Sequence, residues 1–178
     1  DARMSLEISV WQKAPGKLLQ KMQTPGGTVT IVYDGKQGLQ ISPAGKQPLT
    51  GEALEDIKYE ADLKNILNPE KYGLKISLAG VERLDNGDAY RLDYETPAGK
   101  KWTEYYDVKS GLKIRQVKSL GPQMGNMNQT VDYSDYRDVS GIKYPFKIVQ
   151  SMGPQKIELT VKSMKVNSGI DDSVFKVK

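Results

Sequence analysis

The side chains that could do chemistry in this chain are mainly carboxylates, because its 178 residues include no His and no Cys. His is the commonest general base and zinc ligand near neutral pH, and Cys supplies thiolate nucleophiles and disulfides. Triad hydrolysis and His-based metalloprotease chemistry are therefore excluded. The pair Asp171-Asp172 could act in acid–base catalysis, but Ser173 follows it directly, and this order favours the start of a short helical turn.

Three further carboxylates, Asp132, Asp135 and Asp138, are spaced three residues apart. In a strand this spacing places successive side chains on opposite faces of the sheet, so we do not expect them to share a metal ion. The sequence therefore predicts a domain that is not an enzyme and that uses no metal and no cofactor.

The charge pattern argues against a nucleic-acid partner. The formal net charge is +4, but 22 acidic residues are interleaved with the basic ones, and the longest basic run is Lys100-Lys101. Such mixing is typical of a solvated surface. Trp11 and Trp102 could stack on bases, but no basic stripe surrounds them, so packing or the rim of a pocket is the favoured interpretation.

The elements that must position these residues are mostly strands. Apolar residues alternate with period two, as at Met4, Leu6, Ile8 and Val10, and no apolar run approaches the roughly 18 residues of a transmembrane helix. Turn pairs such as Asn86-Gly87 separate the runs. The pattern predicts about eleven short strands of a sandwich or barrel, at residues 4–11, 17–23, 28–33, 38–42, 74–84, 89–95, 102–108, 112–120, 129–139, 142–151 and 156–167.

One helix interrupts the strands. Thr50 is the expected N-cap, and Leu54, Ile57 and Ala61 follow at helical spacing. We expect this helix to end near Leu67, because a proline follows two residues later.

Several short strings carry a resemblance to a known family. They are Asp-Ala-Tyr-Arg-Leu at 88–92, Glu-Tyr-Tyr-Asp at 104–107, Ser-Gly-Leu at 110–112, Tyr-Ser-Asp-Tyr-Arg-Asp-Val at 133–139 with Gly141 and Pro145, and Val166-Asn167 followed by Ile-Asp-Asp-Ser-Val-Phe at 170–175. In these strings the chain resembles LolA/LolB-like outer-membrane lipoprotein-sorting proteins. The resemblance implies a single domain over residues 1–178, mainly β with one inserted α-helix, built as a curved antiparallel half-barrel of about eleven strands. That family usually has an N-terminal helix before the first strand, which this chain lacks, so we expect part of the lid to be missing or supplied by preceding sequence.

The same strings are similar to the non-catalytic C-terminal domain that follows insulinase-like (pitrilysin-type) zinc protease modules in Bacteroidetes-type proteins. This chain cannot be the protease itself, because the His-x-x-Glu-His zinc motif needs two His residues.

A curved sheet that one helix covers incompletely could take up acyl chains, since burying each methylene contributes about 0.8 kcal/mol. Each predicted binding residue has an apolar side chain and lies at an inward-facing strand position or on the helix. The wall is Leu6, Ile8, Val10, Val29, Ile31, Leu39, Ile41, Ile76, Leu78 and Leu92, and the lid is Leu54, Ile57 and Ala61. The same residues could equally fill a closed core, and alternation alone does not separate the two arrangements.

Two functional hypotheses follow. The first is a periplasmic carrier in the bacterial cell envelope that holds a lipid or a lipoprotein acyl chain and performs no covalent chemistry. Its expected partners are the acyl chain and an envelope protein. The second is an accessory interaction domain fused to a secreted protease module, with a filled core.

Overall fold

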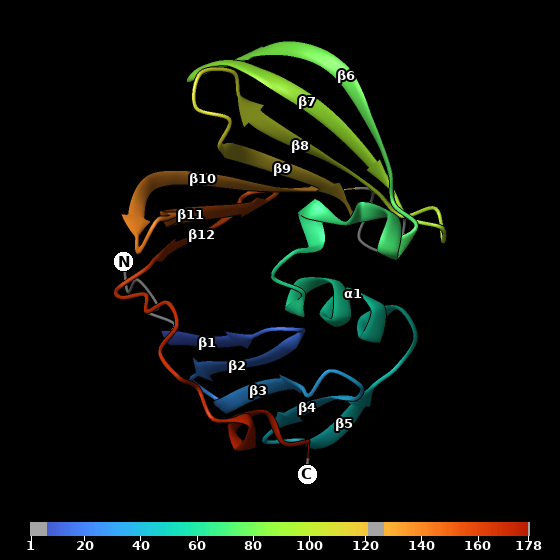
Figure 1. The fold of residues 1–178 in the computed structure, drawn as a ribbon, viewed down its shortest axis with the longest axis vertical. Coiled ribbons are helices and arrows are strands. Elements are labelled where there is room, and N and C mark those ends of the chain that lie inside the picture. The colour runs from blue at the N-terminus through green and yellow to red at the C-terminus, as the bar shows by residue number, and fades with distance from the viewer. Residues whose placement is uncertain (1–6, 121–126, 178) are drawn as a thin grey trace. The chain divides into compact units, whose positions relative to one another are not determined.

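The fold consists of two antiparallel β-sheets and a single α-helix within the described part of the chain. The computed structural model describes residues 7–120 and 127–177. Its five-stranded sheet comes first in sequence and its seven-stranded sheet second, and in both sheets the strand order follows the chain order (Figure 1). The predicted class, mainly β with one inserted helix and a meander topology, is confirmed.

The five-stranded sheet contains four predicted strands and one that the sequence pattern missed. The extra strand is β5, whose residues Gly45 to Pro48 are exposed and show no alternation of apolar side chains. As the edge strand it tolerates a proline at position 48, since one side of it needs no ladder partner. The strands are β1 (Glu7–Lys13), β2 (Lys17–Thr24), β3 (Gly27–Tyr33), β4 (Gly38–Ser42) and β5 (Gly45–Leu49).

The seven-stranded sheet is a continuous meander that begins at β6 on one edge and ends at β12 on the other (Figure 1). All seven strands correspond to predicted ones, although the last ends at Thr160, whereas the alternation predicted an end at Asn167. The strands are β6 (Lys75–Leu84), β7 (Gly87–Glu95), β8 (Lys101–Asp107), β9 (Lys113–Ser119), β10 (Asn128–Val139), β11 (Ile142–Met152) and β12 (Gln155–Thr160).

The helix α1 (Gly51–Ala61) begins at the predicted position but is shorter than predicted. Thr50 occupies the N-cap position, and no side-chain capping bond forms there. The helix ends at Ala61 because Asp62 adopts an extended backbone, and the Asp62 carboxylate accepts a hydrogen bond from the backbone N–H of Lys64 at 2.9 Å. Two short 3-10 helices, η1 (Asn65–Leu67) and η2 (Pro69–Tyr72), occupy the segment where we expected the last helical turn and its end.

Both faces of the five-stranded sheet are covered. On one face Leu18 and Tyr33 pack against Ile57 and Ala61 of α1. On the other face Leu19, Val32 and Leu39 pack around Phe175. Phe175 ends η4 (Asp172–Phe175), a short turn in which the Asp171 carboxylate accepts a hydrogen bond from the Ser173 N–H at 2.8 Å. The helical turn predicted at Asp171-Asp172 is therefore confirmed.

The chain divides into two compact units. The first contains the sequence up to Asn68 together with the segment from Asn167 onward, and the second is Pro69–Val166. The first unit holds the smaller sheet and α1, and the second holds the larger sheet. Within residues 7–120 and 127–177, no helix combines the length and the hydropathy needed to cross a bilayer.

Candidate functional site

One face of the seven-stranded sheet carries both the exposed apolar side chains and a buried polar cluster. Residues directly opposite each other on paired strands lie on the same face of a sheet. The register pairs Leu78 with Leu92, Leu92 with Glu104, and Glu104 with Gln116. We call this surface the Glu104 face.

The Glu104 face is apolar where β6 and β7 meet. A bulge in β6 after Leu78 brings Val81 back to the face of Leu78, opposite Tyr90. Leu78 is 63% exposed, Val81 57%, Tyr90 40% and Ile76 38%. We call Ile76, Leu78, Val81, Tyr90 and Leu92 the β6–β7 apolar edge. Neighbouring large apolar side chains that stay exposed are typical of surfaces that bind something.

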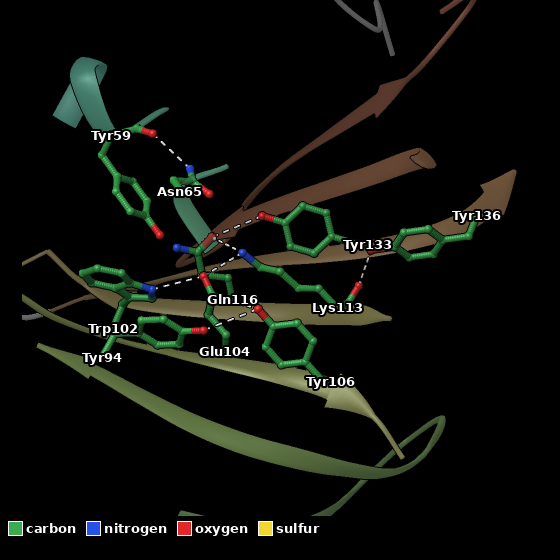
Figure 2. Close-up of polar contacts among 10 residues, drawn as sticks. All are labelled: Tyr59, Asn65, Tyr94, Trp102, Glu104, Tyr106, Lys113, Gln116, Tyr133 and Tyr136. Atoms are coloured by element: carbon green, nitrogen blue, oxygen red, sulfur yellow. Dashed lines mark hydrogen bonds and ion pairs between the residues drawn. The ribbon is translucent and has the colours of Figure 1, made fainter. Parts of the chain in front are cut away.

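Beside this edge lies a buried carboxylate, that of Glu104, which is 5% exposed. Its Oε1 accepts hydrogen bonds from Trp102 Nε1 at 3.1 Å and from Lys113 Nζ at 2.7 Å, and its Oε2 accepts one from the Tyr106 hydroxyl at 2.6 Å (Figure 2). The Lys113 contact is also an ion pair, so the buried negative charge has a positive partner.

Aromatic and amide side chains extend this arrangement across β7 to β10. The ring of Tyr94 stacks on Trp102 with centroids 5.0 Å apart. Gln116 Oε1 accepts from Lys113 Nζ at 3.3 Å and from the Tyr133 hydroxyl at 3.2 Å. We call the whole set the Glu104 cluster: Tyr94, Trp102, Glu104, Tyr106, Lys113, Gln116 and Tyr133 (Figure 2).

The tyrosines of the cluster are held in the neutral, hydrogen-bonding form. Burial, with the nearby negative charge of Glu104, raises the pKa of Tyr94 to about 12. The same two causes raise the pKa values of Tyr106 and Tyr133. Tyr136, whose hydroxyl donates to the Lys113 carbonyl, has its pKa raised by burial to about 12. None of these hydroxyls is poised to lose a proton near neutral pH.

Comparison with known proteins depends on the fold, because neither a scan against protein-family models nor a search of curated proteins finds a match. The LolA superfamily protein NE2245 from Nitrosomonas europaea is similar, with a TM-score of 0.66 and 15% identity over 99% of this chain and 84% of that one. The chain has a LolA-like fold. An outer membrane lipoprotein-sorting protein domain from Vibrio parahaemolyticus is also similar, with a TM-score of 0.63 and 11% identity over 96% of this chain and 80% of that one. A DUF1329 family protein from Desulfovibrio piger gives a TM-score of 0.63 and 14% identity, again over 96% and 80%.

Within this LolA-like fold the predicted wall residues do not all lie on one surface. In the smaller sheet, Ile31 packs on the side of α1, whereas Leu39 and Ile41 belong to the opposite face with Phe175. The register and alternation place Ile8, Val10 and Val29 on the side of Ile31. Leu6 lies outside the described residues.

The predicted lid packs down on the smaller sheet. Ile57 and Ala61 are buried against Leu18 and Tyr33, and Leu54 is partly buried beside them. Of the predicted binding residues, Ile76, Leu78 and Leu92 come together as one surface on the larger sheet, within the β6–β7 apolar edge.

The sequence patterns did not predict the Glu104 cluster. Its local signal is the alternation Trp102, Glu104, Tyr106, which places a carboxylate between two aromatic residues on one face of β8. Lys113, Gln116 and Tyr133 join only through the pairing of β8 with β9 and of β9 with β10, which no local pattern specifies.

The three carboxylates spaced three residues apart, Asp132, Asp135 and Asp138, each have a different partner. Asp132 pairs with Arg115 at 2.6 Å, and Asp135 pairs with Arg137 at 2.6 Å. Asp138 accepts a hydrogen bond from the Gly141 N–H at 2.9 Å. Among the residues that the structure describes, no three His, Cys, Asp or Glu side chains gather as metal ligands.

Proposed function

We propose that this chain is a non-catalytic, carrier-like domain of the bacterial periplasm that binds an acyl chain of a lipid or lipoprotein on the Glu104 face. The observation that carries the proposal is the β6–β7 apolar edge, where Leu78 and Val81 are more than half exposed in a chain with a LolA-like fold. One of the similar structures is described as an outer membrane lipoprotein-sorting domain, which supports the same class of ligand.

The energetics favour an acyl chain as the ligand of this edge. Each methylene that leaves water contributes about 0.8 kcal/mol, so ten of them contribute about 8 kcal/mol before the cost of association is subtracted. Such a ligand needs few directed hydrogen bonds. Side chains of Leu, Ile and Val on an extended sheet surface are suited to it.

The contacts of Glu104 fit a structural role in a binding site better than a role in catalysis. The buried Glu104 accepts three hydrogen bonds and is paired with Lys113. A general base must lie within hydrogen-bond reach of a substrate proton, and this carboxylate is buried and already holds Trp102, Tyr106 and Lys113. We therefore assign Glu104 to the architecture of the site.

The test is binding of a lipidated peptide, with palmitoylated peptide as the probe, monitored by native mass spectrometry and by titration. Wild-type protein is expected to bind, and Leu78→Ser is expected to weaken binding about tenfold, because it removes most of one exposed apolar contact. Val108→Ser is the matched control, since Val108 is 37% exposed and lies in the turn after β8.

If the Leu78→Ser and Val108→Ser proteins bind the peptide with equal affinity, the β6–β7 apolar edge does not contact the acyl chain. A wild-type protein that purifies from the cell envelope without lipid and binds no acylated peptide would contradict the carrier role. That outcome would favour the second hypothesis, an accessory domain of a secreted protease.

A further inference from the structure

Lys113 and Gln116 leave hydrogen-bond donors available in the Glu104 cluster. Both oxygens of Glu104 are engaged by Trp102, Tyr106 and Lys113. Lys113 Nζ has three N–H groups and uses two of them, on Glu104 and Gln116. The side chain of Lys113 is 26% exposed, and its Nζ also lies 5.2 Å from the centroid of the Tyr133 ring. One N–H of this ammonium group therefore has no hydrogen-bond acceptor among the described residues and is available to a ligand.

Gln116 has its orientation fixed by these neighbours. Two donors, Lys113 Nζ and the Tyr133 hydroxyl, converge on its Oε1, which must therefore be the carbonyl oxygen of the amide. The amide nitrogen then points away from them with two N–H groups. No other described residue accepts a hydrogen bond from it, and it is not sealed from solvent.

Two cationic side chains lie in this region, and they suit an anionic ligand. Lys113 pairs with Glu104, and Lys118 lies on the same face, where its Nζ is 5.8 Å from the centroid of the Trp102 ring. Neighbouring strands are about 4.8 Å apart, so Gln116 on β9 lies about 10 Å from Leu92 on β7. An extended chain of twelve carbons is longer than that span.

We propose that the ligand of the Glu104 face is a fatty acid whose carboxylate accepts hydrogen bonds from the Gln116 amide and from Lys113, while its chain lies along the β6–β7 apolar edge. This inference rests on the function proposed above and narrows its ligand class. Apolar contacts would hold the chain, and the Glu104 cluster would select the head group. Glu104 is a positioning residue here, because it holds Lys113 and orients Gln116 through it.

The test compares two probes of equal chain length, laurate and dodecyltrimethylammonium, by isothermal titration. Gln116→Glu keeps an oxygen for Lys113 and Tyr133 but replaces the outward N–H groups by a second acceptor with a negative charge. We expect it to weaken laurate binding at least tenfold, since a hydrogen bond to a charged group is involved, and to leave dodecyltrimethylammonium binding undiminished.

Gln150→Glu is the matched control, because the register puts Gln150 opposite Val131, on the same face but outside the cluster. Unchanged laurate affinity in Gln116→Glu, or an equal loss in both variants, would overturn the assignment of the head-group site. Failure of both probes to bind the wild-type protein would instead contradict the proposed function itself.

A second variant separates lost donors from added repulsion. Gln116→Met removes the amide without adding charge, and it is expected to weaken laurate binding several-fold while dodecyltrimethylammonium binding stays within twofold of wild type. A melting curve checks that each variant is folded. A folded Gln116→Met protein with wild-type laurate affinity would show that the amide does not contact the carboxylate.

Discussion

Glu104 is a buried carboxylate whose neighbours are all donors, from an indole, a phenol and an ammonium group. Taking a charge out of water costs several kcal/mol, and the ion pair with Lys113 and the two further hydrogen bonds offset that cost. The arrangement is therefore sensitive to the loss of any one member. It fixes the conformations of side chains on three adjacent strands, β7, β8 and β9.

Replacing the carboxylate should destabilise the protein strongly. Glu104→Ala leaves Lys113, Tyr106 and Trp102 without their acceptor, and we expect a loss of about 3 kcal/mol in the free energy of unfolding, measured with urea. Asp88→Ala is the comparison, because it also removes a carboxylate from an ion pair, the exposed one with Arg83. It should cost less than about 1 kcal/mol. Similar losses in the two variants would contradict the structural role of Glu104.

The buried tyrosines predict a loss of stability at high pH. Folding raises the pKa of Tyr94 and of Tyr136 to about 12, from about 10 in an unfolded chain. The folded state therefore holds these protons more tightly, so the contribution is complete below pH 10 and is lost as the pH rises from about 10 to about 12.

Urea unfolding at pH 9 and pH 11 measures this effect, and absorbance at 295 nm follows the ionisation. Tyr94→Phe should reduce the loss of stability between the two pH values. A loss of the same size in that variant would assign the effect to other groups.

At the scale of elements, alternation predicted strands wherever one face is more buried than the other. In the described residues it located eleven of the twelve strands. It missed β5, whose side chains are mostly exposed on both faces. Alternation could not say which face is open. In the smaller sheet the side chains on both faces are apolar. The helix α1 covers Leu18 and Tyr33 on one face, and the segment with Phe175 covers Leu19 and Val32 on the other. The predicted wall therefore mixed the two faces.

The C-terminal segment is an integral part of the smaller sheet's core. Phe175 is 1% exposed, and Phe175→Ala should lower the free energy of unfolding by about 3 to 5 kcal/mol through the cavity that it leaves. The neighbouring Val174 is 38% exposed, and Val174→Ala should change the stability by less than about 0.5 kcal/mol. Urea titration followed by tryptophan fluorescence compares the two. An equally small effect of both would mean that the segment is not packed as described.

At the scale of the whole molecule, the larger sheet is an insertion within the smaller unit. The chain passes between the units at Asn68–Pro69 and again at Val166–Asn167. No local pattern reveals this arrangement, because it depends on Phe175 packing against residues more than a hundred positions earlier. The sequence predicted one domain over residues 1–178, and the two connections support our proposal that the units unfold together.

A cooperative single domain predicts one urea transition, with coincident midpoints from far-ultraviolet circular dichroism and tryptophan fluorescence. Phe175→Ala should then lower the hydrogen-exchange protection of β6 to β12 as well as that of β1 to β5. Two separated transitions, or a loss of protection confined to β1 to β5, would divide the chain into two domains.

The packing of Phe175 also determines when the core of the smaller sheet can be completed during synthesis of the chain. A ribosome delivers β1 to β5 well before Phe175, the residue that completes one of their two apolar clusters. All strands of the larger sheet have been synthesised by the time this aromatic ring emerges. Until then Leu19, Val32 and Leu39 lack their cover, and the nascent protein presents an apolar surface of the kind that chaperones bind.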